Sequence, residues 1–307
     1  MIWPLTCLFG SGFIKKLVEW EKNYRKSSEG SDEIPDYSAM KEIKKGDLTC
    51  SIEKTADKIR IILDAPGSSA SIDPVNGARI SSWKLDKREL VCQDKNAGLG
   101  VDAFWWPAKA SCRMISPYEY AGQEISGNAV SVSFRKLISA NDCVPLAGMT
   151  ILKTISLSKN GRKLDVSSKI VNTSDAEKNF SFRYHNMISY LEQLNGSSGT
   201  ATMKNSDNSV IFKREYMIKL FRLAVVPDKD LENCFHMDNV FQINSARVLF
   251  ESPNFPFSVF CNVENKDDLY SYIFWDSGKQ NCSTFEPLFK KVALAPGKSW
   301  TAFESWY

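Results

Sequence analysis

From Leu48 onward, apolar and polar residues alternate with a period of two over many short segments separated by turn residues. This alternation is typical of antiparallel strands with one buried face. Helices do not alternate with the strands, which argues against a βαβ architecture. We therefore expect an all-β fold, a large antiparallel β-supersandwich without a helix after residue 46. The predicted strands cover 59–63, 78–85, 89–92, 129–137, 150–157, 163–171, 180–190, 247–250, 257–261 and 270–275. Short apolar runs stand at 221–226 and 240–243, and the chain closes with the segments 291–294 and 299–307.

One hairpin and one loop are predicted from their residues alone. Asn160-Gly161 separates two strongly alternating segments, and Asn-Gly suits both positive-φ positions of a two-residue type I′ turn. Residues 195–208 are rich in Gly, Ser, Thr and Asn and are expected to form a loop.

The N-terminal segment has a different pattern. Residues 13–25 carry apolar positions at helical spacing, and residues 26–42 are polar with Gly, Pro and Ser. We therefore divide the chain into an extension over 1–45, a helix with a linker, and a β domain over 46–307. The apolar run 1–13 lacks a preceding basic region and is shorter than the ~20 residues that cross a bilayer, so it predicts neither a secretory signal nor a transmembrane segment.

Charge and cysteine spacing restrict the partners. The chain has 39 basic and 36 acidic residues, interspersed along its length, which argues against a nucleic-acid partner. Its eight cysteines form no CxxC pair and only two histidines accompany them, so no metal site is expected. Several cysteines lie in apolar runs, as small buried residues do. We expect reduced thiols and a cytoplasmic protein, with a secreted or periplasmic one as the alternative.

Candidate chemistry centres on His185, in the strand-like run 180–190. It is either a packed core histidine or an acid/base group directed into a cleft. Asp238 and Glu286 lie on two later β segments. A histidine with two carboxylates can move protons on a sugar hydroxyl and ring oxygen.

The order of several short motifs resembles the galactose mutarotase-like superfamily, which includes aldose 1-epimerases and sugar-binding domains of glycoside hydrolases. Residues 76–83 (NGARISSW) resemble its opening hairpin, residues 152–172 its long central hairpin, and residues 294–299 (LAPGKS) its closing turn. The resemblance covers residues 50–307 and implies a carbohydrate partner, a monosaccharide or a glycan end, with neither metal nor organic cofactor.

By motif, the resemblance also implies roles for three residues. His185 in Tyr-His-Asn matches the acid that protonates the ring oxygen, Glu286 in Phe-Glu-Pro the base at the C1 hydroxyl, and Asp238 in Asp-Asn-Val-Phe a ligand of sugar hydroxyls. Epimerases of this family carry a second histidine upstream, and this chain has none before His185.

Four further residues are candidates for substrate binding. Arg183 shares the face of His185 in a regular strand. Arg79 either reaches the site or lies on an edge strand. Trp105 and Trp106 suit sugar stacking as well as core packing, and at most one of them should face a ligand. The sequence thus predicts an aldose 1-epimerase-like enzyme or, as the alternative, a non-catalytic sugar-binding module of a larger glycoside hydrolase.

Overall fold

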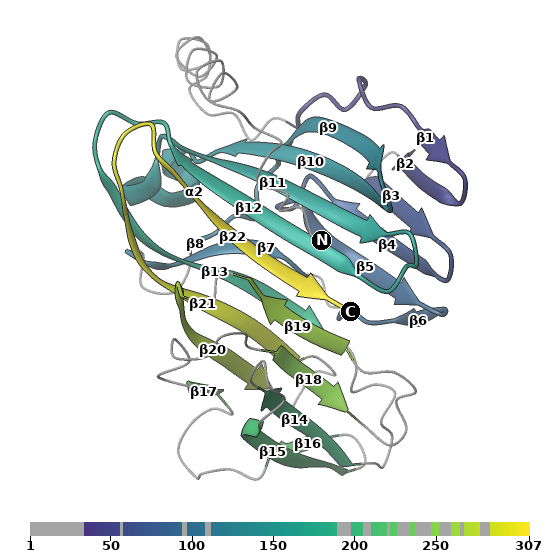
Figure 1. Cartoon of the computed structure of the whole chain (residues 1–307). Coiled ribbons are helices and arrows are strands. Elements are labelled where there is room, and N and C mark those ends of the chain that lie inside the picture. The colour runs from purple at the N-terminus through teal and green to yellow at the C-terminus, as the bar shows by residue number, and fades with distance from the viewer. Residues whose placement is uncertain are drawn as a thin grey trace.

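The computed structural model describes residues 34–307 except 56–57, 94–96, 108–111, 189–197, 205–209, 220–221, 226–233, 237–246, 252–258, 265–266 and 277–282. Within these residues the fold consists almost entirely of antiparallel strands in three sheets (Figure 1). The prediction of a large all-β sandwich is confirmed.

The first sheet is a meander of six strands that follow one another in sequence. Alternate residues of β3 and β4 are buried, as the period-two pattern requires. The strands are β1 (Ile43–Lys45), β2 (Leu48–Lys54), β3 (Ile59–Ala65), β4 (Ser68–Asp73), β5 (Arg79–Leu85) and β6 (Arg88–Glu89).

The second sheet has ten strands in the order β16-β15-β14-β18-β19-β22-β12-β11-β10-β9. It joins the central hairpin to the C-terminal strand, because β12 pairs with β22 along its length. The bounds are β9 (Glu119–Ser126), β10 (Ala129–Leu137), β11 (Met149–Ser158), β12 (Leu164–Asn172), β14 (Ser198–Lys204), β15 (Val210–Lys219), β16 (Arg222–Val225), β18 (Arg247–Glu251), β19 (Val259–Val263) and β22 (Ser299–Trp306).

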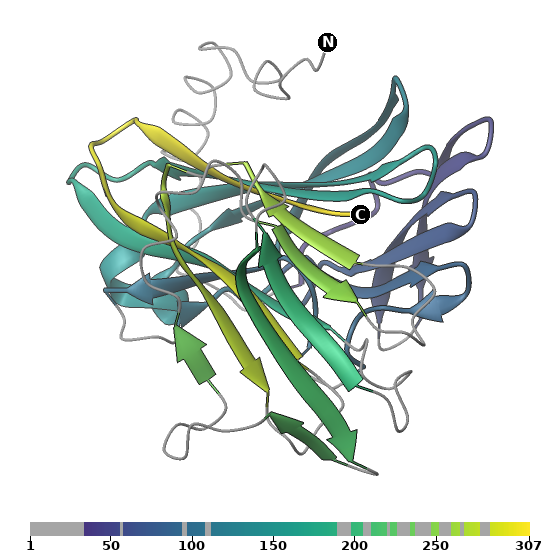
Figure 2. The same ribbon diagram turned by 60° about the horizontal axis from the view of Figure 1, so that its bottom comes forward.

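The third sheet has the order β17-β20-β21-β13-β7-β8 and lies against the second (Figures 1 and 2). Tyr184 on β13 donates a hydrogen bond across this interface to the carbonyl of Ala302 on β22, at 3.1 Å. The strands are β7 (Val101–Trp106), β8 (Cys112–Arg113), β13 (Lys178–Ile188), β17 (Cys234–His236), β20 (Leu269–Asp276) and β21 (Ser283–Leu294).

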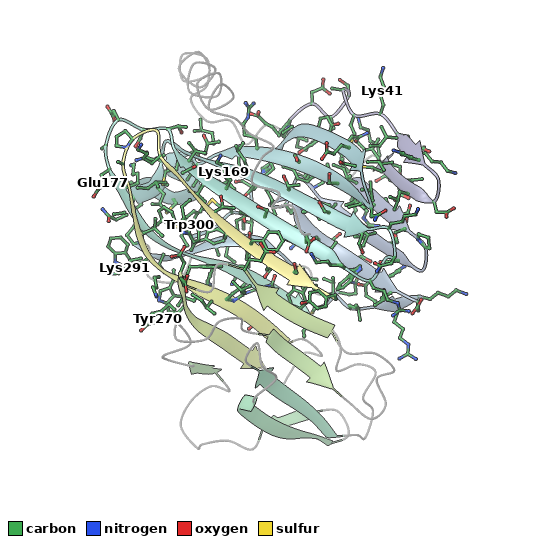
Figure 3. All side chains as sticks on the ribbon, viewed as in Figure 1. Lys41, Lys169, Glu177, Tyr270, Lys291 and Trp300 are labelled. Atoms are coloured by element: carbon green, nitrogen blue, oxygen red, sulfur yellow. The ribbon has the colours of Figure 1, made fainter. Side chains whose placement is uncertain are left out.

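One hydrophobic core connects the three sheets. Between the second and third sheets it is aromatic: Phe182 packs edge-on against Phe104 and Tyr184, with ring centroids 5.5 and 5.0 Å apart. Trp300 on β22 packs against Phe289 at 5.2 Å (Figure 3). Such rings bury large apolar areas in favourable edge-to-face contacts, so β13 is held firmly against the second sheet.

Three local predictions are wrong. A short helix, α2 (Ala140–Cys143), interrupts the strands because Ser139 and Asp142 form a capping box. Strand β14 occupies 198–204 within the predicted loop, since it pairs with β15 and β18. The predicted hairpin exists, but only Gly161 of its turn has a positive φ. Asn160 instead accepts hydrogen bonds from the Ser158 hydroxyl and the Arg162 amide, at 2.6 and 3.1 Å.

The predicted helix at 13–25 lies outside the described residues. Part of the predicted extension packs onto the fold, because Met40 belongs to the main core and β1 pairs with β2. The division at residue 45 stays a prediction. In the described part of the chain, no helix is long and apolar enough to cross a membrane.

The cysteines are in two states. Cys50, Cys112 and Cys143 carry free thiols, whereas Cys92 is disulfide-bonded. The expectation of reduced thiols is therefore wrong at Cys92. Tertiary packing, not spacing along the chain, decides which cysteines meet, so the sequence alone could not reveal this bond.

Candidate functional site

His185 and Glu286 occupy opposing positions on neighbouring antiparallel strands. β13 pairs with β21 through Arg183↔Leu288 and Asn186↔Phe285, and this register sets His185 across from Glu286. Directly opposed residues in an antiparallel pair project from the same face, with Cβ atoms ~4.5–5.5 Å apart. Two residues far apart in sequence are thereby brought together, as the sequence predicted.

The two side chains contact each other and Arg183. His185 Nε2 lies 3.4 Å from Glu286 Oε1, and the Arg183 guanidinium pairs with Glu286 Oε2. All three residues are buried, with 4–7% of their surface exposed. His185 Nδ1 is also buried and has no hydrogen-bond partner among the described residues. A buried polar atom without a partner costs free energy, and such atoms concentrate at functional sites.

A β-bulge brings Trp105 to this cluster. β7 pairs Phe104 with Phe182 and Trp106 with Ser181, so Trp105 is the extra residue. Its ring lies 5.2 Å from the guanidinium carbon of Arg183, a cation–π contact. Trp106 instead contacts Lys291, at 4.6 Å, whose side chain projects from the edge of the molecule (Figure 3). Bulges commonly redirect side chains beside functional sites.

Arg113 is a site residue that the sequence analysis missed. It lies on β8, whose two residues are too few for a recognisable pattern, and pairs with Ala103 next to Arg183 on β13. Its positive charge lowers the pKa of both His185 and Glu286. A second cation therefore stands beside the cluster.

Burial and charge set the protonation of the pair. Burial, then Arg113 and Arg183, lower the pKa of His185 to about 3, so its imidazole is neutral at pH 7. Burial raises the pKa of Glu286 above its ordinary value, while the two arginines and a hydrogen bond with Thr284 oppose this. The 3.4 Å contact thus joins a neutral imidazole and a carboxyl group.

Of the other predicted residues, Arg79 lies on the first sheet and Asp238 lies outside the described residues. Arg79 begins β5 and pairs with Asp73 at 3.8 Å. The sequence predicted no role for His236. Its backbone pairs with Ile273 on β20, and Ile273 in turn pairs with Glu286 on β21.

A buried polar cluster on the inner face of β13 holds this strand in place. Asn186 donates to Glu304 on β22, at 2.8 Å, and accepts from the Gly100 amide, at 2.6 Å. Lys153 pairs with Asp102 at 3.2 Å, beside it. These bonds join β13, β7, β11 and β22 directly behind His185. Among the described residues no cluster of His, Cys, Asp and Glu could hold a metal ion.

Several solved structures have a fold similar to that of this chain. A galactose mutarotase-like protein from Clostridium acetobutylicum superposes with a TM-score of 0.57 at 15% identity, covering 86% of this chain and 99% of that one. This chain has the galactose mutarotase-like fold.

Further structures share the galactose mutarotase-like fold. A putative mutarotase from Salmonella typhimurium has a TM-score of 0.54 at 12% identity, over 87% of this chain and 96% of that one. A putative aldose 1-epimerase from Escherichia coli gives 0.51 at 11%, over 84% and 98%. No family model and no curated protein matches the sequence. At these identities the likeness establishes the mutarotase-like fold alone.

Proposed function

We propose that this protein binds a monosaccharide or a glycan end at His185, Glu286 and Arg183 and interconverts its anomers. The observation that carries this proposal is the direct opposition of His185 and Glu286, 3.4 Å apart, with a buried Nδ1 that lacks a partner among the described residues. The names of the similar structures, mutarotase and aldose 1-epimerase, support the same reaction.

Ring opening of a pyranose needs one base and one acid. Glu286, as a carboxylate, takes the proton from the C1 hydroxyl, and His185, as an imidazolium, gives a proton to the ring oxygen. The C1–O5 bond breaks and leaves an open-chain aldehyde. After rotation about C1–C2, the reverse transfers close the ring as the other anomer and restore both groups.

Neighbouring residues supply binding and orientation. Arg183 holds Glu286 and presents further N–H donors for sugar hydroxyls. Trp105 offers an aromatic face on which the C–H face of a sugar stacks. Asp238 and Arg79 are proposed to bind hydroxyls, and Trp105 is proposed as the one tryptophan of the pair that faces the sugar.

A non-catalytic sugar-binding module is the second candidate, and the state of His185 favours it. With a pKa of about 3, only about one His185 in ten thousand is protonated at pH 7. An acid that is so scarce slows ring opening unless the bound sugar raises this pKa. Binding through hydrogen bonds and stacking needs no such proton.

Proton NMR of anomer equilibration tests both candidates. Freshly dissolved α-glucose, α-galactose and other aldoses are followed with wild type, His185→Ala and Glu286→Gln, and Arg162→Gln is the control because its ion pair with Asp86 is exposed. Acceleration that both site variants lose and the control keeps supports the enzyme. Saturable line broadening without acceleration supports the binding module. Neither effect with any sugar contradicts both.

The disulfide-bonded state of Cys92 bears on the compartment. Disulfides persist in oxidising compartments and are rare in the cytoplasm. Because Cys92 is disulfide-bonded, we propose a secreted or periplasmic location over a cytoplasmic one. Non-reducing mass spectrometry of the protein from its native source tests this, and a fully reduced Cys92 contradicts it.

A further inference from the structure

Two free thiols lie on contacting elements at the edge of the third sheet. Cys112 lies on β8 and Cys143 at the end of α2, and both are reduced in this structure. β8 and α2 contact each other. Both cysteines also pack against the main core, Cys143 fully and Cys112 partly buried. Two cysteines on contacting elements differ from a single buried cysteine, which is normally inert.

The backbone on either side of this pair is fixed by other contacts. Cys112 pairs with Phe104 in the sheet. The Ser116 hydroxyl, just beyond β8, donates to the Asp142 carboxylate, which neighbours Cys143. Asp142 also pairs with Lys136 at 3.0 Å. The fold thus holds β8 and α2 together at the two cysteines, so that a disulfide between them would need little backbone movement.

We propose that Cys112 and Cys143 are a site of oxidative modification, which a low-molecular-weight disulfide such as oxidised glutathione converts into an intramolecular disulfide. The Cys112 thiolate attacks one sulfur of oxidised glutathione and releases glutathione thiolate. Cys143 then loses its proton to solvent and attacks the Cys112 sulfur, which releases the second glutathione. Two protein thiols lose two electrons in total, and one glutathione disulfide gains them.

The order of attack follows from the surroundings of each thiol. Cys112 is partly exposed, whereas Cys143 is 3% exposed. Burial, followed by the neighbouring Cys112, raises the pKa of the Cys143 thiol to about 12. The thiolate is the nucleophile, so Cys112 reacts first and Cys143 resolves the mixed disulfide.

The cross-link would also fix the edge of the candidate site. Arg113 follows Cys112 on the two-residue strand β8 and acts electrostatically on His185 and Glu286. A bond from Cys112 to α2 would tether this strand to the core. The cross-link itself does not depend on the proposed function, since it rests on the thiol pair alone.

Peptide mapping of the full chain tests the cross-link. The protein is exposed to oxidised glutathione, blocked by alkylation and digested with trypsin without reduction. Trypsin releases Cys112 in residues 110–113 and Cys143 in 137–153. We expect these peptides to be disulfide-linked, while Cys50, whose thiol faces Gln123 at 3.6 Å, stays alkylated. Recovery of both peptides singly alkylated, or of Cys112 linked to another cysteine, overturns the proposal.

Two variants complete the test. Cys143→Ser should stop at a Cys112–glutathione adduct, because the resolving thiol is gone. The melting temperature of oxidised wild type should be roughly 5 °C above that of Cys112→Ser treated in the same way, because the new bond restricts the unfolded chain. The difference between the melting temperatures of the two untreated proteins is subtracted first. An unmodified Cys112 in Cys143→Ser, or no gain in melting temperature, contradicts the proposed reaction.

Discussion

His185 Nε2 lies 3.4 Å from Glu286 Oε1, and Arg183 occupies the other carboxylate oxygen. The carboxyl group is therefore shared between a fixed cation and a neutral imidazole. Since burial, and then Arg113 and Arg183, disfavour a positive charge on His185, the charge state of the pair depends in part on these arginines. This dependence leads to two predictions about protonation.

The first prediction concerns the pKa of His185. In the wild type its imidazole should titrate at about pH 3, far below an ordinary histidine. Arg183→Gln removes one of the repelling charges and should raise this pKa. Proton–carbon NMR of the imidazole rings measures both values, because the chain has only two histidines and His236→Gln assigns the other. Arg162→Gln should leave the titration of His185 unchanged, because Arg162 forms an exposed ion pair with Asp86. Titration near pH 6.5 in the wild type would contradict the described site.

The second prediction concerns the pH dependence of anomer interconversion, if the proposed reaction takes place. It requires protonated His185, and this form decreases tenfold for each pH unit above its pKa of about 3. We therefore expect the enzymatic rate constant, after subtraction of the buffer-catalysed rate, to fall about tenfold per pH unit between pH 5 and pH 8. Polarimetry at fixed ionic strength measures it. A plateau across neutral pH would mean that the bound sugar raises the pKa of His185 or that another group supplies the proton.

The sequence predicted the strands of this fold better than its site. Residues 129–137 were predicted as a strand with the bounds that β10 has, because alternation over nine residues leaves one way to bury the apolar face. His185, Glu286 and Arg183 were identified together. Arg113 was not, because a two-residue strand has no period and its place depends on pairing with Ala103. The sequence could not tell which of Trp105 and Trp106 reaches the cluster. The bulge in β7 decides this, and a bulge depends on strand pairing, which the pattern of apolar and polar residues does not encode.

A third prediction concerns the buried ion pair of Lys153 and Asp102. Both side chains are fully buried, and Asp102 also accepts hydrogen bonds from Tyr118 and Ser168, at 2.7 and 2.5 Å. Lys153→Met leaves the Asp102 charge without its cation and should cost about 3–5 kcal/mol in the free energy of unfolding. Urea denaturation followed by circular dichroism measures this cost.

Two further variants serve as controls for this ion pair. Lys153→Met combined with Asp102→Asn should recover part of the loss, because the Asp102 charge is then removed together with its cation. Lys84→Met, at an exposed position of β5, should change stability by less than about 0.5 kcal/mol. A cost for Lys153→Met as small as that of Lys84→Met would mean that Asp102 is not charged in the folded protein.

The last prediction concerns Glu304, which is fully buried behind His185 and accepts a hydrogen bond from Asn186. Burial raises its pKa to about 7, although Asn186, Trp306 and Lys153 oppose this; Asp102 adds to the rise. Between about pH 4.5 and pH 7 the folded state therefore keeps a proton that the unfolded state has lost. The stabilisation is complete below pH 4.5 and is lost as the pH rises through 7. The loss amounts to about 3 kcal/mol.

Glu304→Gln isolates this contribution, because glutamine is neutral at every pH and its amide oxygen still accepts from Asn186. The fixed cost of the substitution cancels when only the change with pH is compared. From pH 4.5 to pH 8 the wild type should therefore lose about 3 kcal/mol more stability than Glu304→Gln. Urea denaturation across this range measures the difference, and Glu124→Gln, at an exposed position of β9, should follow the wild type. If Glu304→Gln also followed the wild type at every pH, Glu304 would have to be ionised throughout, held by Lys153 against the cost of its burial.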